Sequence, residues 1–175
     1  MNQVKFKKYQ KAAFLDRDGV INKDIDYLHK IRDFEWIEGA KESIKFLKDS
    51  GFLVIVITNQ SGVGRGFYSQ EDLEYLHNWI NDQLKKQKTK IDDFFFSTDL
   101  PPKKIFESRR KPSPAMINEA IKKYNLDRSK CFLIGDKKTD LESAKNADIK
   151  GFLFKGGSLF DLTMLILKKN KFLEK

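Results

Sequence analysis

The sequence contains few residues that cross-link a chain or force it to turn, and no segment that could cross a membrane. Its 175 residues include one cysteine and four prolines, and we find no repeat, low-complexity tract or long linker. A disulfide within the chain is impossible, and we expect the single cysteine, Cys131, to be buried within the apolar run 131–134. No apolar run approaches the roughly 18 residues of a membrane span, and no apolar signal core follows the basic N-terminus. We therefore expect a cytoplasmic protein.

A surplus of positive charge is the main compositional feature. The chain has 34 Lys and Arg against 25 Asp and Glu, a net charge of +9. This balance favours anionic partners, namely phosphorylated metabolites, nucleic acid or acidic lipid. The alternative is an ordinary solvated surface, because lysines such as Lys41, Lys45 and Lys48 fit an outer helix face. With 40% hydrophobic residues, the chain is predicted to form one domain over residues 1–175, and we expect a monomer.

Short apolar runs alternate with amphipathic helical patterns along the chain, as in α/β proteins. The runs are continuously apolar, which indicates strands buried on both faces. Ser69 fits the N-cap of one helix and Pro114 the first residue of another. The pattern predicts a doubly wound parallel sheet, and the short spacing between the first strand and the first helix leaves no room for a separate cap domain. The expected strands are 12–15, 53–57, 94–96, 131–134 and 152–154, and the expected helices are 40–50, 70–84, 114–124, 140–146 and 159–169.

Polar residues follow the ends of several expected strands. In a doubly wound sheet the ligand site lies beyond these carboxyl ends. Each polar pair taken alone is an ordinary turn or cap, but together they supply carboxylates, a hydroxyl with an amide, and a cationic cluster. That combination suits metal-assisted phosphoryl transfer, and the glycine-rich segment 61–66 lacks the P-loop pattern. The residues that follow strands are Asp16, Asp18, Thr58, Asn59, Asp136 and Asp140, and the cationic cluster of Arg109, Arg110 and Lys111 lies just before the expected helix 114–124.

These residues carry a family resemblance. Asp-x-Asp-Gly-x-x-Asn at 16–22, Thr-Asn at 58–59, Lys111 and Gly-Asp-x-x-x-Asp at 135–140 resemble the four motifs of the haloacid dehalogenase (HAD) superfamily, in order. The similarity is closer to the branch that contains heptose-bisphosphate and histidinol-phosphate phosphatases. It is carried by Asp-Arg-Asp-Gly-Val-Ile-Asn, Thr-Asn-Gln-Ser-Gly-Val-Gly-Arg-Gly, Arg-Lys-Pro-Ser-Pro and the segment 27–39, and it covers about residues 12–155.

The resemblance implies roles for the motif residues. Asp16 would be the nucleophile that forms an aspartyl-phosphate, and Asp18 the acid that protonates the leaving oxygen and then the base for water. Thr58 and the Asn59 backbone amide would hold phosphoryl oxygens, while Lys111 offsets negative charge.

The resemblance also implies a metal. Mg²⁺ would be held by the carboxylates of Asp16 and Asp136 and the backbone carbonyl of Asp18. Asp140 would support this set by orienting Lys111. We expect Asn22 to be a turn residue that holds the Asp16 loop.

The implied reaction is removal of the 7-phosphate of D-glycero-D-manno-heptose 1,7-bisphosphate, in nucleotide-activated heptose synthesis for lipopolysaccharide or capsule. Arg65, Arg110 and Lys137 are the candidate cations for the rest of this phosphorylated sugar. Histidinol-phosphate phosphatase is the alternative. A DNA 3′-phosphatase is less favoured because no aromatic-basic stripe is present, and so is a non-enzymatic receiver domain, to which Asp18 would be unsuited.

One departure from the branch concerns zinc. Its members often carry a zinc loop of three cysteines and one histidine before the Arg-Lys-Pro run. Here the comparable positions hold no cysteine, so we expect no thiolate zinc site, and His29 and His77 are expected to be ordinary polar or half-buried residues. We expect Pro101 and Pro102 to restrict the backbone conformations of this loop by fixing φ, and we expect the loop to be mobile without substrate. The comparable positions are Ser97, Asp99, Glu107 and Arg109.

Overall fold

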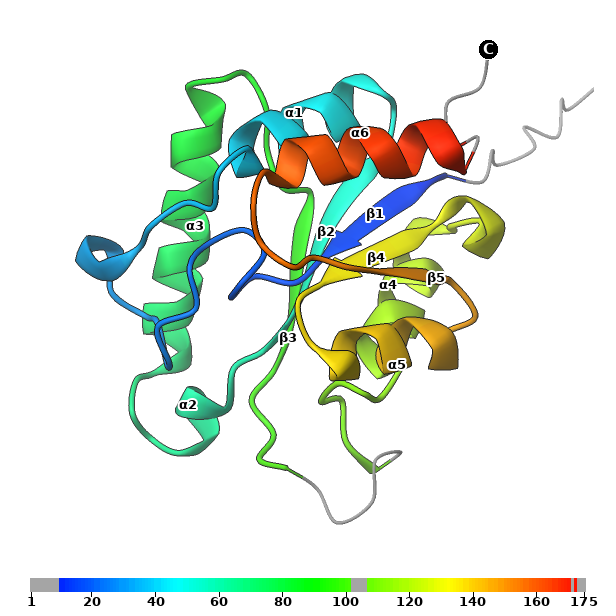
Figure 1. The fold of residues 1–175 in the computed structure, drawn as a ribbon. Helices are drawn as coiled ribbons and strands as arrows, with labels where there is room; N and C mark the ends of the chain where they lie inside the picture. The colour runs from blue at the N-terminus through cyan, green and yellow to red at the C-terminus, as the bar shows by residue number, and fades with distance from the viewer. Residues whose placement is uncertain (1–9, 102–106, 171, 173–175) are drawn as a thin grey trace, which may run out of the picture.

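The computed structural model describes residues 10–101, 107–170 and 172, and shows five parallel strands in one sheet (Figure 1). The strand order is β3-β2-β1-β4-β5, so the first strand lies at the centre between β2 and β4. The doubly wound parallel sheet predicted from the sequence is confirmed. The strands are β1 (Ala12–Leu15), β2 (Leu53–Asn59), β3 (Asp93–Ser97), β4 (Phe132–Gly135) and β5 (Lys150–Leu153).

Helices cover both faces of the sheet. α1, α3 and α6 contribute apolar residues to the core on one face, and α4 and α5 to the core on the other. The described residues include no separate cap domain, and none of their helices is both long and apolar enough to span a bilayer. The helices are α1 (Ala40–Asp49), α2 (Ser61–Gly64), α3 (Gln70–Lys85), α4 (Ala115–Tyr124), α5 (Lys138–Asn146) and α6 (Leu159–Lys169), with 3-10 turns η1 (Ile31–Asp33) and η3 (Arg128–Lys130).

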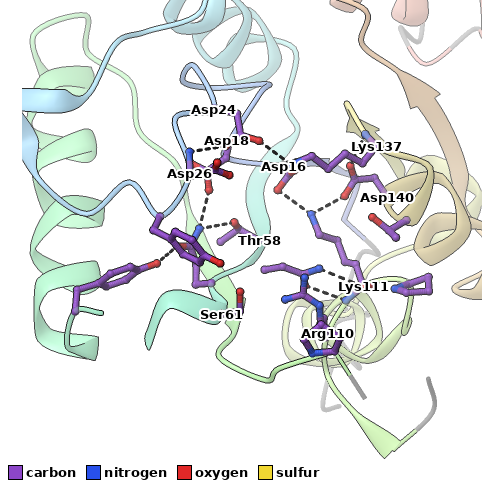
Figure 2. Close-up of a pocket in the computed structure, with 17 residues that line it drawn as sticks. Asp16, Asp18, Asp24, Asp26, Thr58, Ser61, Arg110, Lys111, Lys137 and Asp140 are labelled. Atoms are coloured by element: carbon purple, nitrogen blue, oxygen red, sulfur yellow. Dashed lines mark hydrogen bonds and ion pairs between the residues drawn. The ribbon is translucent and has the colours of Figure 1, made fainter. Parts of the chain in front are cut away.

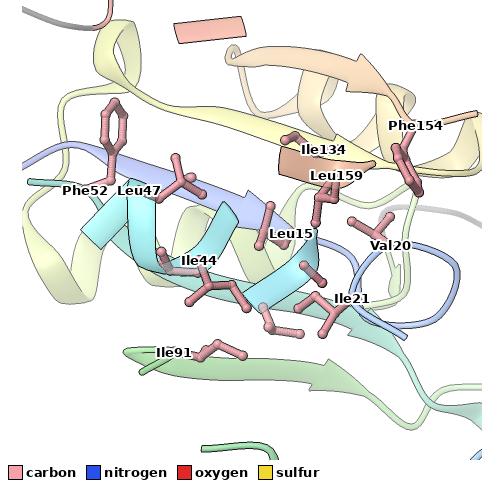
Figure 3. Packing of buried hydrophobic residues seen from close by; sticks show 14 of the residues in the cluster. Leu15, Val20, Ile21, Ile44, Leu47, Phe52, Ile91, Ile134, Phe154 and Leu159 are labelled. Atoms are coloured by element: carbon pink, nitrogen blue, oxygen red, sulfur yellow. The ribbon is translucent and has the colours of Figure 1, made fainter. Parts of the chain in front are cut away.

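Side chains alternate between two apolar cores along the central strands, as the period of two in a strand requires. In β1, Leu15 packs on the α1 and α6 side, whereas Phe14 packs on the opposite side. Figure 3 shows Leu15 together with Ile44 of α1 and Leu159 of α6. Burial of both faces is confirmed for β1, β2 and β4, whereas the edge strand β3 is mostly half-buried and the edge strand β5 mostly exposed. Cys131, just before β4, is 1% exposed, as expected.

Several element boundaries differ from the sequence prediction by one or two residues. β2 runs two residues further, to Asn59, because backbone pairing with β3 does not require apolar side chains. β5 begins at Lys150, two residues early, for the same reason. Pro114 is the N-cap of α4 rather than its first residue, since its ψ of 1° is not helical while its carbonyl already accepts from Asn118.

Part of the glycine-rich segment 61–66 forms the short helix α2, which the sequence analysis did not predict. α2 is closed by hydrogen bonds from Arg65 N to the Ser61 carbonyl and from Phe67 N to the Gly62 carbonyl. A side chain at Gly62 would place its Cβ 2.2 Å from Cε1 of Tyr68. The glycine therefore serves close packing against Tyr68 and not flexibility.

Candidate active site

A cavity of about 500 Å³ lies where β1 and β2 end, and residues that follow β4 form part of its wall (Figure 2). Its lining includes Asp16 and Asp18 after β1 and Thr58 and Asn59 at the end of β2. The parallel strands thus bring these predicted site residues together, as expected for a doubly wound sheet. Lys111, Arg110, Lys137 and Asp140 also line it.

A buried ammonium group lies at the centre of the site. Nζ of Lys111 is 2.7 Å from Oδ1 of Asp16 and 2.6 Å from Oδ1 of Asp140, and donates to the Ile57 carbonyl at 2.9 Å. Burial alone would lower the pKa of Lys111, but Asp16 and Asp140 outweigh it and raise that pKa. The lysine therefore stays charged and compensates two buried carboxylates.

Asn59 holds the chain segment that carries Lys111. Its side-chain oxygen accepts from the Lys111 backbone N–H at 2.9 Å, and its amide nitrogen donates to the Lys111 carbonyl at 3.2 Å. The sequence suggested only a backbone contact to phosphate for Asn59. The side chain instead fixes the position of the lysine relative to β2.

Asp16 has an electrostatically costly environment. Burial raises its pKa to about 7, the attraction of Lys111 opposes this rise, and the nearby Asp140 adds to it. Its Oδ1 also accepts from the Arg17 backbone N–H at 2.8 Å. A carboxylate so placed needs further positive charge to stay ionised at neutral pH.

The donor set beside Asp16 suits a divalent cation. Carboxylate oxygens of Asp16, Asp136 and Asp140 lie within 4.8 Å of one another. Oδ1 of Asp136 is buried without a hydrogen-bond partner among the described residues, and burial raises its pKa. Gly19, at φ +89°, allows this approach, because a Cβ there would lie 2.3 Å from Oδ2 of Asp136. Oxygen-only ligands of this kind fit Mg²⁺.

Asp18 is held by a dense set of donors. It accepts from Nη2 of Arg17 at 3.0 Å, Nδ2 of Asn22 at 2.9 Å and Nε2 of Gln60 at 2.8 Å. Asn22 was expected to hold the Asp16 loop. It is fully buried and holds this loop through its hydrogen bond to Asp18. Arg17 and Gln60 were missed by the sequence analysis. A signal existed for Arg17, since period-two alternation continued past β1 turns it toward the same core as Leu15.

The three candidate cations for the rest of the substrate lie in different settings. Arg110 lines the cavity and donates to the Asp99 carbonyl at 3.3 Å. Burial, and then the charge of Arg65, lower the pKa of Arg110, which places the two guanidinium groups near each other although Arg65 does not line the cavity. Lys137 lines the cavity but is paired with Asp24 at 2.7 Å, a partner that its sequence neighbourhood did not reveal.

The positions that correspond to the zinc loop form bonds within the chain. Oδ2 of Asp99 accepts from Oγ of Ser108 at 2.6 Å and from the Arg109 backbone N–H at 2.9 Å. The Arg109 guanidinium pairs with Glu119 at 2.8 Å. Residues 102–106, with Pro102, lie outside the described residues, so the expected mobility of this loop stays a prediction.

The two histidines lie away from the carboxylate cluster. His29 stacks on Tyr68 with ring centroids 4.7 Å apart. His77 is buried rather than half-buried, with Nε2 3.3 Å from Nη1 of Arg17. Within the described ranges the sole group of potential metal-binding side chains is that of Asp16, Asp136 and Asp140.

Comparison with known proteins places this site in a family. The model of HAD-hydrolase-like proteins matches residues 108–163. A D-glycero-alpha-D-manno-heptose-1,7-bisphosphate 7-phosphatase from Photorhabdus laumondii is 42% identical over 153 residues, 84% of each chain. The corresponding beta-anomer phosphatase from Rhodopseudomonas palustris is 41% identical over 150 residues, 83% of each chain.

A solved structure agrees with these sequence matches. The D,D-heptose 1,7-bisphosphate phosphatase from B. bronchiseptica, complexed with magnesium and phosphate, superposes with a TM-score of 0.80. It is 26% identical, and the match covers 91% of the present chain and 99% of the other. The chain therefore belongs to the HAD superfamily of phosphatases, in the family of D-glycero-D-manno-heptose-1,7-bisphosphate 7-phosphatases.

Proposed function

We propose that the protein removes the 7-phosphate of D-glycero-D-manno-heptose 1,7-bisphosphate, in nucleotide-activated heptose synthesis. The observation that carries the proposal is the placement of Asp16 on the cavity wall, next to the Lys111 ammonium and the half-buried Asp136 carboxylate. The shared family with heptose-bisphosphate phosphatases supports the substrate. Relatives named for either anomer lie at nearly equal identity, so the proposal covers both.

In the first step, a carboxylate oxygen of Asp16 forms a bond to the phosphorus of the 7-phosphate. The bond from phosphorus to the sugar oxygen breaks, and Asp18 donates a proton to that oxygen. Thr58 and the Asn59 backbone N–H bind oxygens of the transferring group, and Lys111 offsets its charge.

In the second step, Asp18 takes a proton from water. The water oxygen bonds to phosphorus, and the bond between phosphorus and Asp16 breaks to release inorganic phosphate. Mg²⁺, held by Asp16, Asp136 and the Asp18 backbone carbonyl, would neutralise charge on the phosphoryl oxygens throughout. Asp140 contributes by orienting Lys111, to which it is paired.

The retained 1-phosphate needs its own cation. We assign this role first to Arg110, because its guanidinium lines the cavity and donates to one backbone carbonyl, leaving other N–H groups for phosphate. Lys137 is engaged by Asp24 and would have to exchange or share that partner. Arg65 would strengthen the positive potential beside Arg110 without lining the cavity.

A phosphate-release panel tests the proposal. It contains both anomers of the heptose bisphosphate, histidinol phosphate and a 3′-phosphorylated oligonucleotide. Activity on the bisphosphate should require Mg²⁺, vanish with EDTA and be abolished by Asp16→Asn with the fold intact. Substantial turnover by Asp16→Asn, or clear preference for histidinol phosphate or the oligonucleotide, would overturn it.

The same panel tests the cation assignment. Because a hydrogen bond to a charged group contributes about 1.5–3 kcal/mol, Arg110→Ala should lower kcat/KM for the bisphosphate about ten- to a hundredfold. A small monophosphate should be much less affected. Equal loss on both substrates would instead place Arg110 at the reaction centre or in folding.

A further inference from the structure

Gln60 connects the proposed acid-base carboxylate to the proposed phosphate-binding hydroxyl. It follows β2, lines the cavity and is 2% exposed. Its Nε2 donates to Oδ2 of Asp18 at 2.8 Å and to Oγ1 of Thr58 at 2.9 Å. One amide group therefore contacts both the residue proposed to protonate the leaving oxygen and the residue proposed to bind the transferred phosphoryl group.

The orientation of this amide is fixed by its other end. Oε1 of Gln60 accepts from the Tyr68 hydroxyl at 2.7 Å and from Nη2 of Arg17 at 3.2 Å. Arginine has donors only, so a reversed amide would set N–H against N–H there and an oxygen against the Asp18 carboxylate. The Nε2 group must consequently face Asp18 and Thr58.

The two donors to Oε1 are themselves held in place. The Tyr68 ring packs on Gly62, which has no room for a Cβ, and stacks on His29. Burial, helped by the charge of Arg17, lowers the pKa of His77 well below its usual value. His77 is thus neutral, and its Nε2 accepts from Nη1 of Arg17, because the guanidinium cannot accept.

This arrangement fixes the direction of the Thr58 hydroxyl and the position of the Asp18 carboxylate. Since Oγ1 of Thr58 accepts from Gln60, the hydroxyl hydrogen of Thr58 points elsewhere and is available to a phosphoryl oxygen in the cavity. The carboxylate of Asp18 is 18% exposed and is held at the cavity wall. We infer that Gln60 is a positioning residue that aligns Asp18 for proton transfer to the leaving oxygen, an inference that rests on the proposed roles of Asp18 and Thr58.

The test compares two leaving groups in the Mg²⁺-loaded enzyme. The substrates are phenyl phosphate and p-nitrophenyl phosphate, whose use does not depend on which sugar is the natural substrate. Phenolate is the more basic leaving group, so its departure depends more on a proton from the enzyme than that of p-nitrophenolate. Gln60→Met is similar in size but has no hydrogen-bond donor. It should lower kcat/KM about tenfold more for phenyl phosphate than for p-nitrophenyl phosphate, because misplacing a general acid removes part of its rate contribution. Because kcat/KM reports steps up to formation of the aspartyl-phosphate, later hydrolysis does not mask the difference.

Two further variants make the result specific. Tyr68→Phe keeps the ring but removes the hydroxyl that orients the amide, so it should show the same leaving-group pattern with a smaller loss. It also serves if Gln60→Met does not fold. Gln70→Met, the same change at an exposed residue of α3, should leave kcat/KM unchanged for both substrates.

Asp18→Asn in the same assay separates the inference from the proposed function. If Asp18→Asn shows the leaving-group difference but Gln60→Met and Tyr68→Phe reduce both substrates equally, the inference is overturned and the role of Asp18 stands. If Asp18→Asn affects both substrates equally, the acid role itself fails and the inference fails with it. A shared pattern in all three variants supports Gln60 as the residue that positions Asp18.

Discussion

The environment of Asp16 opposes its own ionisation. Burial raises its pKa from 3.8 to about 7, so in the metal-free folded protein it binds a proton that the unfolded chain has already released. Between these two pH values the folded state holds more protons than the unfolded state. Its stability therefore falls as pH rises through this window and levels off above it.

We predict that Asp16→Asn stabilises the metal-free protein at high pH. The melting temperature of the variant should exceed that of the wild type at pH 8, because the buried charge is gone. The gap should shrink as the pH falls from about 7 toward 3.8, below which Asp16 is protonated in both states, at up to about 1.4 kcal/mol per pH unit. Thermal melts with and without Mg²⁺ measure this, and Mg²⁺ should narrow the gap by stabilising the wild type. Asp82→Asn, on the exposed surface of α3, is the control, and a gap independent of pH would contradict the assignment.

At this scale the sequence predicted which charged groups would meet but not how they are held. Asp16, Asp18 and Thr58 follow from strand-end positions, because parallel strands end at one edge, whereas Lys111 was assigned by the family resemblance from its place before the expected helix 114–124. The contact of Lys137 with Asp24 joins residues 113 positions apart. Such pairs depend on side-chain directions in the folded state, for which a single sequence carries no local signal.

At the scale of elements, the segment around Asp99 is fastened by hydrogen bonds. The carboxylate of Asp99 accepts hydrogen bonds from Ser108 and from the Arg109 backbone. These bonds, that of the Ser108 hydroxyl first, lower the pKa of Asp99 although burial opposes them. These contacts join the two sides of the loop that leads to Arg110. They support the expectation that the loop closes without zinc, which stays a prediction.

We predict that Asp99→Ala lowers the free energy of unfolding by roughly 1–2 kcal/mol, since it removes two bonds to a partly exposed charge. It should also reduce kcat/KM for the bisphosphate through Arg110. Asp99→Asn, which keeps one acceptor oxygen, should lose less unfolding free energy than Asp99→Ala.

Elemental analysis should find no stoichiometric zinc in the wild type, and a chelator should leave its melting temperature in Mg²⁺-free buffer unchanged. One tightly held zinc per chain would contradict this reading of the loop.

Element boundaries were predicted where local chemistry decides them. Ser69 begins α3 as expected, with a capping box in which Oγ accepts from Asp72 N and Oδ2 of Asp72 accepts from Ser69 N. The helix α2 was missed because a run of small residues has no helical apolar stripe. Its Gly62 packs closely against Tyr68, a contact made only after the chain folds back.

At the scale of the whole molecule, positive charge and the position of the site act together. The net charge is +9, whereas the cavity is lined by Arg110, Lys111 and Lys137 together with five aspartates. The positive charge of the whole chain attracts anions to the protein, Arg110 gives a second phosphate a local partner, and salt screens both attractions.

We predict that salt weakens use of the bisphosphate more than use of a monophosphate. Between about 0.03 M and about 0.3 M NaCl, kcat/KM for the bisphosphate should fall roughly tenfold, and that for a monophosphate a few-fold. Steady-state rates at constant Mg²⁺ measure both. The slope for the bisphosphate should become shallower in Arg110→Ala, and equal slopes for the two substrates would show that attraction to the second phosphate does not contribute.

The single cysteine makes the protein convenient for site-specific probes. Burial raises the pKa of the Cys131 thiol to about 11, so almost no thiolate is present at neutral pH to react with a maleimide. A second cysteine introduced at an exposed position near the cavity, such as Phe67, which is 57% exposed, would be the one labelled. A fluorophore there could report substrate arrival in real time without first removing the native thiol.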